Sequence, residues 1–284
     1  IFLLNWNSSE DIKICLEKIL KSDYQQYRII LIDNDSREVD KKNLIYFFEE
    51  IQKSNKVEIH LVLNDKNFGY AGGNNRAYEY AKVNNLEGDI LIINPDISVS
   101  KTTLTEMYNT LYKGEHIGGV MTRTLNNCGE IIYDYISMQG LNQRWLITND
   151  DNIETDYLAG SCLLLRRDVV ELIGLFNEQF FMYWEEVDLS FRIKRNNFRL
   201  LSTTRTSVIR KDNALSKNFN MYFYMTRNVI LMKKIHKSIS LFNLIKVLLN
   251  MLKISFMNSY RFKNIKYLTV YFKGLFSGIT TKIT

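Results

Sequence analysis

The sequence predicts an α/β fold in which helices flank a mostly parallel sheet, followed by a basic helical extension. Short apolar segments rich in β-branched residues alternate with segments of helical periodicity over the first hundred residues, which is typical of a sheet built from β-α-β units. Polar residues gather where these apolar segments end. Of the 284 residues, 46% are hydrophobic, so a sizeable core is available.

The expected elements follow one another in a regular order. Strands are expected at residues 1–4, 28–32, 57–63 and 90–93. Helices are expected to begin at Ser8 or Ser9, at about residue 40, and after the glycine-rich turn at 67–75. Pro95, the one proline, ends the fourth strand abruptly. Residues 120–155 predict a hairpin or mixed-strand region. Beyond them regular structure returns at 158–165, with an apolar strand after Gly160 and Ser161. We also expect helices after Arg167 and from Glu185, and helical structure from 217 onward.

Charge divides the chain into two parts. Residues 211–284 contain thirteen Lys or Arg and one acid, Asp212, for a net +12; removing these from totals of 37 and 31 leaves 24 basic and 30 acidic residues, or −6, in residues 1–210. An acidic body suits a metal-dependent site, whereas a basic and apolar tail suits an anionic membrane surface. No known nucleic-acid-binding pattern is found. We therefore expect a main domain at 1–212 and a helical, membrane-proximal extension at 213–284.

Cysteine usage indicates a reducing compartment. Cys15, Cys128 and Cys162 are widely spaced, odd in number and lack the spacing of a metal site. The chain begins in an apolar strand without a basic leader, and no uninterrupted apolar span of about 20 residues is found. We therefore expect a cytoplasmic protein without a simple membrane anchor.

One segment of the tail has an amphipathic pattern. Across residues 238–257 a narrow polar stripe interrupts an otherwise apolar helix, formed by Asn243, Lys246, Asn250 and Lys253. Such a helix fits a membrane interface. The alternative is packing against the body or against a second subunit in a homodimer.

The ends of four predicted strands carry the polar residues that suggest a site. They include Asn5 and Asn7, Asp33, the turn with Asn67, Gly69 and Gly73, and Asn94 with Asp96. In an open α/β sheet these ends meet in one crevice. A carboxylate such as Asp96 could hold a hydrated divalent cation against a phosphorylated substrate there. Each residue alone is also an ordinary turn residue.

These motifs resemble, in order, those of family 2 glycosyltransferases, particularly rhamnosyltransferase-like members. The matching segments are 5–7, 33–36, 67–74, 94–96, 174–178 and 183–189, and the resemblance covers about residues 1–230. It implies a GT-A fold, a nucleotide-diphosphate sugar donor, Mg²⁺ or Mn²⁺, and transfer with inversion at the anomeric carbon.

The resemblance also implies roles for individual residues. Asp33 corresponds to the position that hydrogen-bonds the nucleotide base, with Asn5 and Asn7 nearby, and Asp96 to the metal ligand. Gly160 lies in the segment beside the donor sugar. The catalytic base is the second acid of a pair, here Glu186, where the family more often has aspartate; Asp188 and Glu185 are the alternatives.

One position departs from the family pattern. Where the family commonly has a histidine that completes the metal site, this chain has Arg210. Arginine cannot ligate a cation but can neutralise phosphate. Either Asp96 holds the metal with donor oxygens and water, or Arg210 makes the metal dispensable, or the chain is inactive.

The expected function is therefore that of an inverting hexosyltransferase. It would move rhamnose or another hexose onto a lipid-linked or polysaccharide acceptor in bacterial surface glycan synthesis, at the inner face of the cell membrane. The alternative is a catalytically silent sugar-nucleotide-binding or scaffolding homologue. A nicotinamide dehydrogenase is disfavoured because the turn at 69–73 is no Gly-x-Gly-x-x-Gly motif and follows the third strand.

Overall fold

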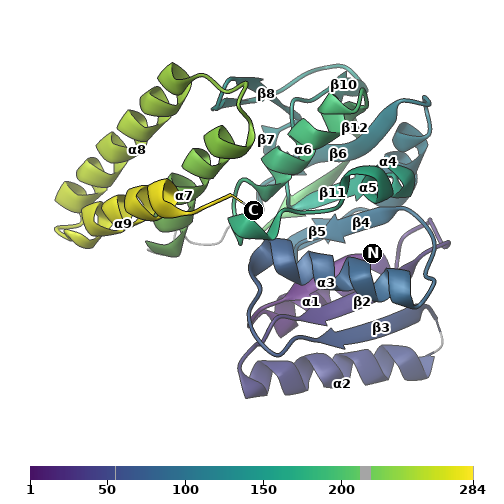
Figure 1. Cartoon of the computed structure of the whole chain (residues 1–284). Coiled ribbons are helices and arrows are strands. Elements are labelled where there is room, and N and C mark those ends of the chain that lie inside the picture. The colour runs from purple at the N-terminus through teal and green to yellow at the C-terminus, as the bar shows by residue number, and fades with distance from the viewer. Residues whose placement is uncertain (55, 212–218, 284) are drawn as a thin grey trace.

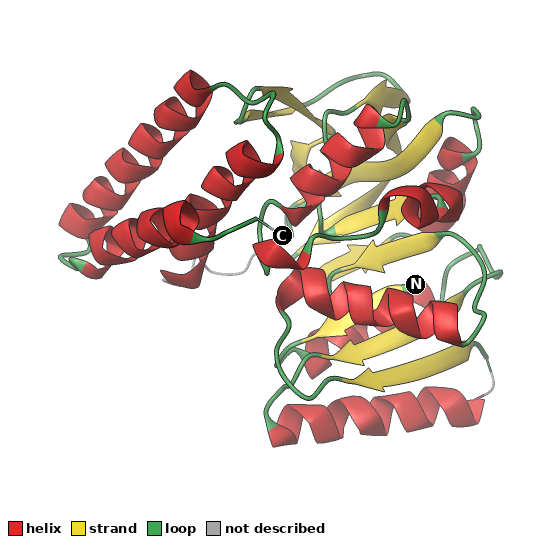
Figure 2. Ribbon diagram, viewed as in Figure 1, coloured by secondary structure: helices red, strands yellow, loops and turns green. Residues whose placement is uncertain are grey.

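A mixed sheet flanked by helices forms the body of the protein. The computed structural model describes residues 1–54, 56–211 and 219–283, and within them ten strands form one sheet and two form a separate hairpin (Figures 1 and 2). The strands of the large sheet are β1 (Phe2–Asn5), β2 (Arg28–Asp33), β3 (Glu58–Leu63), β4 (Ile90–Ile93), β5 (Ile97–Val99), β6 (Ile117–Leu125), β7 (Ile131–Tyr133), β10 (Asn152–Glu154), β11 (Cys162–Leu165) and β12 (Arg199–Arg210).

The strand order confirms the α/β prediction. The main path runs β10-β12-β6-β11-β4-β1-β2-β3. Strands β3, β2, β1 and β4 pair in parallel, as do β6 and β12, while β11 is antiparallel to both of its neighbours. The irregular region holds the expected hairpins: β7 turns back on β6, and β8 (Tyr135–Gln139) pairs with β9 (Asn142–Leu146).

Helices cover both faces of the sheet. They are α1 (Ser9–Ile19), α2 (Glu38–Ser54), α3 (Gly69–Val83), α4 (Thr103–Leu111), α5 (Arg167–Ile173) and α6 (Glu185–Arg195). Along β4, Ile90 and Ile92 belong to a buried cluster with α3, α5 and α6, whereas Leu91 and Ile93 belong to a second cluster with α1, α2 and α4. This strand lacks the alternation of polar and apolar residues because both of its faces are buried.

The C-terminal segment is helical, as expected. It consists of α7 (Phe219–Ile235), α8 (Leu241–Arg261) and α9 (Lys266–Thr280), which lie together at one side of the body (Figure 1). Helix α9 approaches α7 closely at Gly274 and Gly278, where an added Cβ would come 2.6 Å from the carbonyl oxygen of Phe223 and 2.8 Å from that of Arg227. The predicted boundary between residues 212 and 213, and the start of helical structure at 217, lie outside the described residues.

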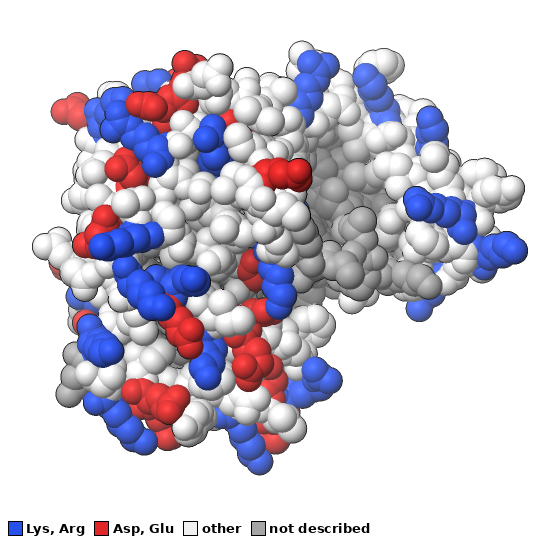
Figure 3. Space-filling model, turned by 180° about the vertical axis from the view of Figure 1, so that it is seen from behind, with Lys and Arg blue, Asp and Glu red and all other residues white. Residues whose placement is uncertain are grey.

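Among the described helices, α8 is long and apolar enough to cross a membrane by length and composition. Leu244 and Val247 on one side of it are buried, while Phe242 and Leu249 on the other are exposed. Seen from behind, the lobe formed by the C-terminal helices shows Lys and Arg and no Asp or Glu (Figure 3).

Candidate active site

The polar strand ends lie at one edge of the sheet, as the sequence predicts. Asn5 and Asp33 are paired residues at the ends of β1 and β2. The backbone N–H of Asn94, after β4, donates to the carbonyl oxygen of Ser161 at 2.9 Å, and Arg210 at the end of β12 pairs with Ile97. This is the edge at which open α/β sheets bind their ligands.

The first corner of this edge is a buried hydrogen-bond network around Asn5. The Asn5 side-chain amide donates to Asp33 Oδ1 at 2.9 Å, Ser36 Oγ at 3.0 Å and Asp40 Oδ2 at 2.7 Å. Asn5 and Asp33 are fully buried, so both side chains shape the two turns. Nucleotide binding by Asn5, Asn7 and Asp33 stays a prediction.

Asp40 takes part in this network, although no sequence pattern predicted a role for it. Its Oδ1 accepts hydrogen bonds from the backbone and hydroxyl of Ser9 at 3.0 and 2.8 Å. Burial raises the pKa of Asp40, but the hydrogen bonds from Asn5 and Ser9 outweigh burial and lower the pKa overall. The ionised carboxylate therefore ties the start of α1 to α2.

The glycine-rich turn is fixed by packing. Asn34, a fully buried residue whose role the sequence did not reveal, donates to Asn67 Oδ1 and to the carbonyl oxygen of Gly69, both at 3.0 Å. Gly69 has a φ of +73°, and a Cβ there would come 2.3 Å from the carbonyl oxygen of Phe181; a Cβ on Gly73 would come 2.6 Å from Leu4. Asn67, Gly69 and Gly73 thus set where α3 begins, and donor contact stays a prediction for them.

The second corner brings Asp96 next to two cationic residues. The backbone N–H of Lys211 donates to the carbonyl oxygen of Asp96 at 2.9 Å, and the pairing of Arg210 with Ile97 places that arginine at the same turn. Both Asp96 and Arg210 are half-buried. A carboxylate oxygen donor suits Mg²⁺ or Mn²⁺, and an arginine can bind phosphate. The Lys211 ammonium is paired with Asp11 Oδ1 at 2.8 Å. Among the described residues no group of three or more His, Cys, Asp or Glu side chains forms a metal site.

The paired acids Glu185 and Glu186 open α6 at the centre of this edge. Each has an Oε2 atom that is inaccessible to water and has no hydrogen-bond partner among the described residues. A Cβ added to Gly160 would lie 3.7 Å from the carboxyl carbon of Glu186 and 3.6 Å from the Tyr70 hydroxyl. Glu186 and Tyr70 therefore face the same glycine, and the Tyr70 hydroxyl donates to the Gly160 carbonyl oxygen at 2.5 Å.

Burial makes both acids weaker than ordinary glutamates. It raises the pKa of Glu186, and it raises the pKa of Glu185 well above the usual value, where the charge of Glu186 adds to the effect. A negative charge on one carboxylate disfavours ionisation of its neighbour. The pair therefore holds a proton more readily than two separated glutamates would.

Asp188, an alternative for the base, is held in a structural network. It is fully buried, its Oδ2 accepts from Arg192 Nε at 2.8 Å, and its Oδ1 lies 2.8 Å from Nε2 of His236, beyond the end of α7. Arg192 also donates to the carbonyl oxygens of Ile173 and Gly174. Since both of its oxygens have partners, Asp188 fixes α6 in place, and the base predicted at Glu186, with Glu185 as an alternative, stays a prediction.

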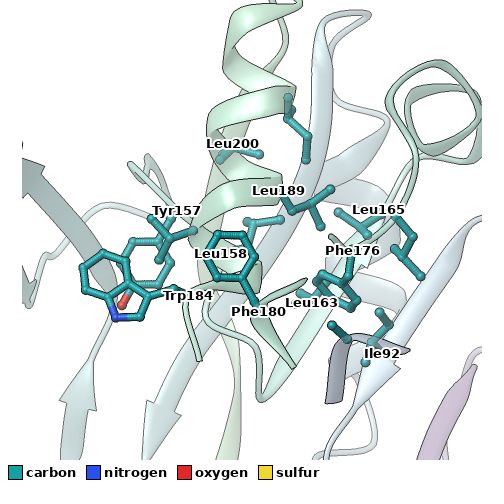
Figure 4. Packing of buried hydrophobic residues seen from close by; sticks show 14 of the residues in the cluster. Ile92, Tyr157, Leu158, Leu163, Leu165, Phe176, Phe180, Trp184, Leu189 and Leu200 are labelled. Atoms are coloured by element: carbon teal, nitrogen blue, oxygen red, sulfur yellow. The ribbon is translucent and has the colours of Figure 1, made fainter. Parts of the chain in front are cut away.

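An aromatic loop leads into the acids. Phe180 and Trp184 belong to the buried cluster that also includes Tyr157 and Leu158 (Figure 4). Phe181, Tyr183 and Trp184 have φ values of +64°, +67° and +76°, a conformation that side-chain-bearing residues rarely adopt. The loop therefore stores backbone strain beside the candidate base.

Comparisons with known proteins identify the relatives of this chain. The profile described as glycosyl transferase family 2 matches residues 1–174. The low-salt glycan biosynthesis hexosyltransferase Agl10 of Haloferax volcanii is 28% identical over 207 residues, which cover 70% of this chain and 62% of that protein. An N-acetylglucosaminyl-diphospho-decaprenol L-rhamnosyltransferase of Mycobacterium tuberculosis is 51% identical over 37 residues, covering 13% and 12% of the two chains.

Solved structures share the fold. GalNAc-T7 with UDP, GalNAc and Mn²⁺ superposes with a TM-score of 0.65 at 15% identity, covering 80% of this chain and 50% of that one. The mannosyltransferase PcManGT of Pyrobaculum calidifontis, in complex with GDP-Man and Mn²⁺, gives 0.60 at 12% identity, covering 100% and 75%. S. aureus TarS 1–349 with UDP-GlcNAc gives 0.58 at 13% identity, covering 95% and 89%.

Proposed function

Because the chain belongs to glycosyl transferase family 2, we propose that it transfers a sugar from a nucleoside-diphosphate donor to an acceptor hydroxyl with inversion at the anomeric carbon. The observation that carries this proposal is the unpartnered, buried Oε2 of Glu186, whose carboxyl group faces Gly160, beside the Ser161 carbonyl that pairs with Asn94. A site with one carboxylate that can accept a proton and one that can bind a metal has the groups that direct displacement needs.

Glu186 acts as the general base. It accepts the proton of the acceptor hydroxyl while that oxygen attacks the anomeric carbon from the face opposite the diphosphate. Burial raises the pKa of Glu186, which makes its ionised form a stronger base than an exposed carboxylate. Gly160 makes this side of Glu186 narrow, since an added Cβ there would already be in van der Waals contact with the Glu186 carboxylate and the Tyr70 hydroxyl.

The opposite side of the site stabilises the leaving group. Asp96 would hold Mg²⁺ or Mn²⁺, which supplies positive charge to the departing diphosphate. Arg210 lies at the same turn, where its guanidinium contributes further positive charge to the phosphates. The structural relatives with UDP or GDP-Man and Mn²⁺ support a divalent cation at this corner.

The sugar, the acceptor and the location form the finer part of the proposal. We favour rhamnose or another hexose as the transferred sugar and a lipid-linked or polysaccharide acceptor in surface glycan synthesis. The names of the two curated relatives support this choice. The matched region spans 62% of the length of that hexosyltransferase. The basic helices α8 and α9 would keep the enzyme at the inner face of the cell membrane, as a monomer or a homodimer.

A catalytically silent homologue is the second candidate, and Arg210 favours it. A cation at the position of an expected metal ligand would weaken metal binding by charge repulsion. Such a protein would bind sugar nucleotides without transferring sugar.

One assay separates the two candidates. Release of nucleoside diphosphate is measured with a panel of nucleotide sugars, with and without a polyprenyl-linked acceptor, in Mg²⁺, in Mn²⁺ and in chelator. We expect release from one donor that depends on acceptor and metal and that falls by ~100-fold or more in Asp96→Asn. Donor binding without any release of nucleoside diphosphate would contradict the proposed enzymatic activity. Full activity in chelator would contradict the proposed need for a metal ion and would leave Arg210 as the cation that neutralises the phosphates.

A further inference from the structure

The loop before the acids needs support from outside itself. Three of its residues, Phe181, Tyr183 and Trp184, have positive φ values, and each such conformation costs roughly 1–3 kcal/mol. Trp184 caps the start of α6, and its carbonyl oxygen accepts from the backbone N–H of Asp188 at 2.9 Å. The conformation of the loop therefore decides where the carboxylates of Glu185 and Glu186 point.

One face of the loop is supported by Asn228 of α7. This residue is fully buried, and its side-chain amide lies 2.8 Å from the carbonyl oxygens of Phe180, Met182 and Tyr183. The two N–H groups of one amide thus serve three carbonyl oxygens of the same short loop. No other type of side chain of this size donates two hydrogens from one atom without carrying a charge.

The neighbours of Asn228 on α7 hold the same loop. Arg227 donates from Nη2 to the carbonyl oxygen of Gln179 at 2.7 Å. The ring of Tyr224 stacks on that of Phe181, with centroids 5.0 Å apart and planes 17° from parallel. One helical turn of α7 therefore contacts the whole loop.

The other face of the loop rests on α3. The backbone N–H of Ala71 donates to the carbonyl oxygen of Phe181 at 3.1 Å, and Gly69 leaves room for that oxygen. The loop is held between α7 and α3. If the contacts with one helix are removed, we expect the strained loop to move towards that helix.

We propose that Asn228 is a positioning residue that fixes the strained loop and thereby orients the Glu186 carboxylate towards the acceptor hydroxyl. This inference rests on the proposed function, in which Glu186 is the base. Asn228 itself touches no reacting atom. Its loss would displace Glu186 while the nucleotide corner, on β1 and β2, stays as it is.

The test compares Asn228→Ala and Asn228→Asp with the control Thr226→Val. Asp keeps the size of the side chain and removes its N–H donors. Thr226 is an equally buried polar residue of α7 whose hydroxyl donates to the Tyr222 carbonyl oxygen of the same helix. The measured quantities are kcat, the KM for the nucleotide sugar, the melting temperature and the hydrogen exchange of amides 181–187.

In both Asn228 variants we expect kcat to fall by ~10- to 100-fold, because small displacements of a reacting group are costly, while KM for the donor is unchanged. Amides 181–187 exchange faster, and Thr226→Val behaves as wild type. Folded variants with wild-type kcat and exchange would overturn the proposal, as would a fall in donor affinity equal to the fall in kcat. If the wild type transfers no sugar, the proposed function fails, and unchanged exchange in the Asn228 variants would then overturn the loop support separately.

Discussion

At the scale of single residues, the two neighbouring acids Glu185 and Glu186 differ because of where their carboxylates lie. Glu185 is almost fully buried, whereas Glu186 is half-buried and faces Gly160 and Tyr70. Burial also raises the pKa of Tyr70, and the charges of both glutamates raise it further. Tyr70 therefore stays protonated and can donate a hydrogen bond, while Glu186 is the group that can accept a proton.

The pH dependence of transfer follows from the same burial. Glu186 works as a base only when ionised, and burial raises its pKa, so activity is present above that pKa and is lost as the pH falls through it. The neighbouring titratable side chains are Glu185, Tyr70, Tyr157 and Tyr183, and burial raises the pKa of each. The tyrosines stay neutral throughout this range, so the acid limb belongs to the glutamates.

We therefore expect the acid limb of kcat/KM to lie at higher pH than the usual range of a glutamate, near 4.3. The measurement is kcat/KM from about pH 3.5 to pH 9 with the best donor. The exposed Glu171→Gln variant, altered at the end of α5, serves as a control and keeps the wild-type profile. An acid limb in the usual glutamate range would contradict the buried base.

Much of the site could be predicted from residues at strand ends. Asp33 and Asp96 follow parallel strands, whose carboxyl ends meet at one edge of the sheet, whereas Glu186 belongs to the start of α6. The supporting residues could not be selected, because their partners lie far along the chain: Tyr70 reaches Gly160 across ninety residues. The three carbonyl partners of Asn228 depend on a loop conformation that local sequence does not reveal.

At the scale of elements, helix α8 explains the polar stripe seen in the sequence. Leu244 and Val247, on one side of the helix, are buried. On the other side Phe242, Leu249 and Phe256 are 75%, 60% and 63% exposed, and the lysines of the stripe border them. The sequence predicted an apolar helix with a polar stripe but could not tell that one apolar side packs against the protein while the other does not.

This exposed side predicts binding to anionic vesicles. Each large apolar side chain moved out of water contributes roughly 1.5–3 kcal/mol, and the lysines add attraction to anionic lipid. The triple variant Phe242→Ser, Leu249→Ser and Phe256→Ser should bind phosphatidylglycerol vesicles much more weakly than wild type in a co-sedimentation assay.

The matched control is Val83→Ser at the end of α3, since Val83 is 79% exposed but lies on the body. The control should sediment as wild type does, and added salt should reduce binding of both. Undiminished vesicle binding by the triple variant would contradict membrane binding through the exposed side of α8. Equal binding to anionic and neutral vesicles would contradict the role of the lysines.

At the scale of the whole molecule, the two halves of the sheet bear different groups of the proposed site. Strands β1 to β4 form the parallel half that bears Asp33 and Asp96, and β11 with α6 supplies Gly160 and the acids. The parallel half could be predicted because each strand and helix is a local pattern. The insertion of antiparallel β11 between β4 and β6, and the pairing of β12 with both β5 and β6, depend on contacts distant in sequence. The apolar strand predicted after Gly160 and Ser161 is β11, at Cys162–Leu165.

In the proposed mechanism the two halves of the sheet form one catalytic site, in which Glu186 removes the acceptor proton. The most direct measurement is the rate of sugar transfer by Glu186→Gln, beside nucleoside-diphosphate binding by the same protein and transfer by the Glu171→Gln control. We predict that the transfer rate of Glu186→Gln is ~100-fold or more below that of the wild type, while its binding of nucleoside diphosphate is unchanged. The Glu171→Gln control should transfer sugar at the wild-type rate. Transfer by Glu186→Gln at the wild-type rate would contradict the role of Glu186 as the base.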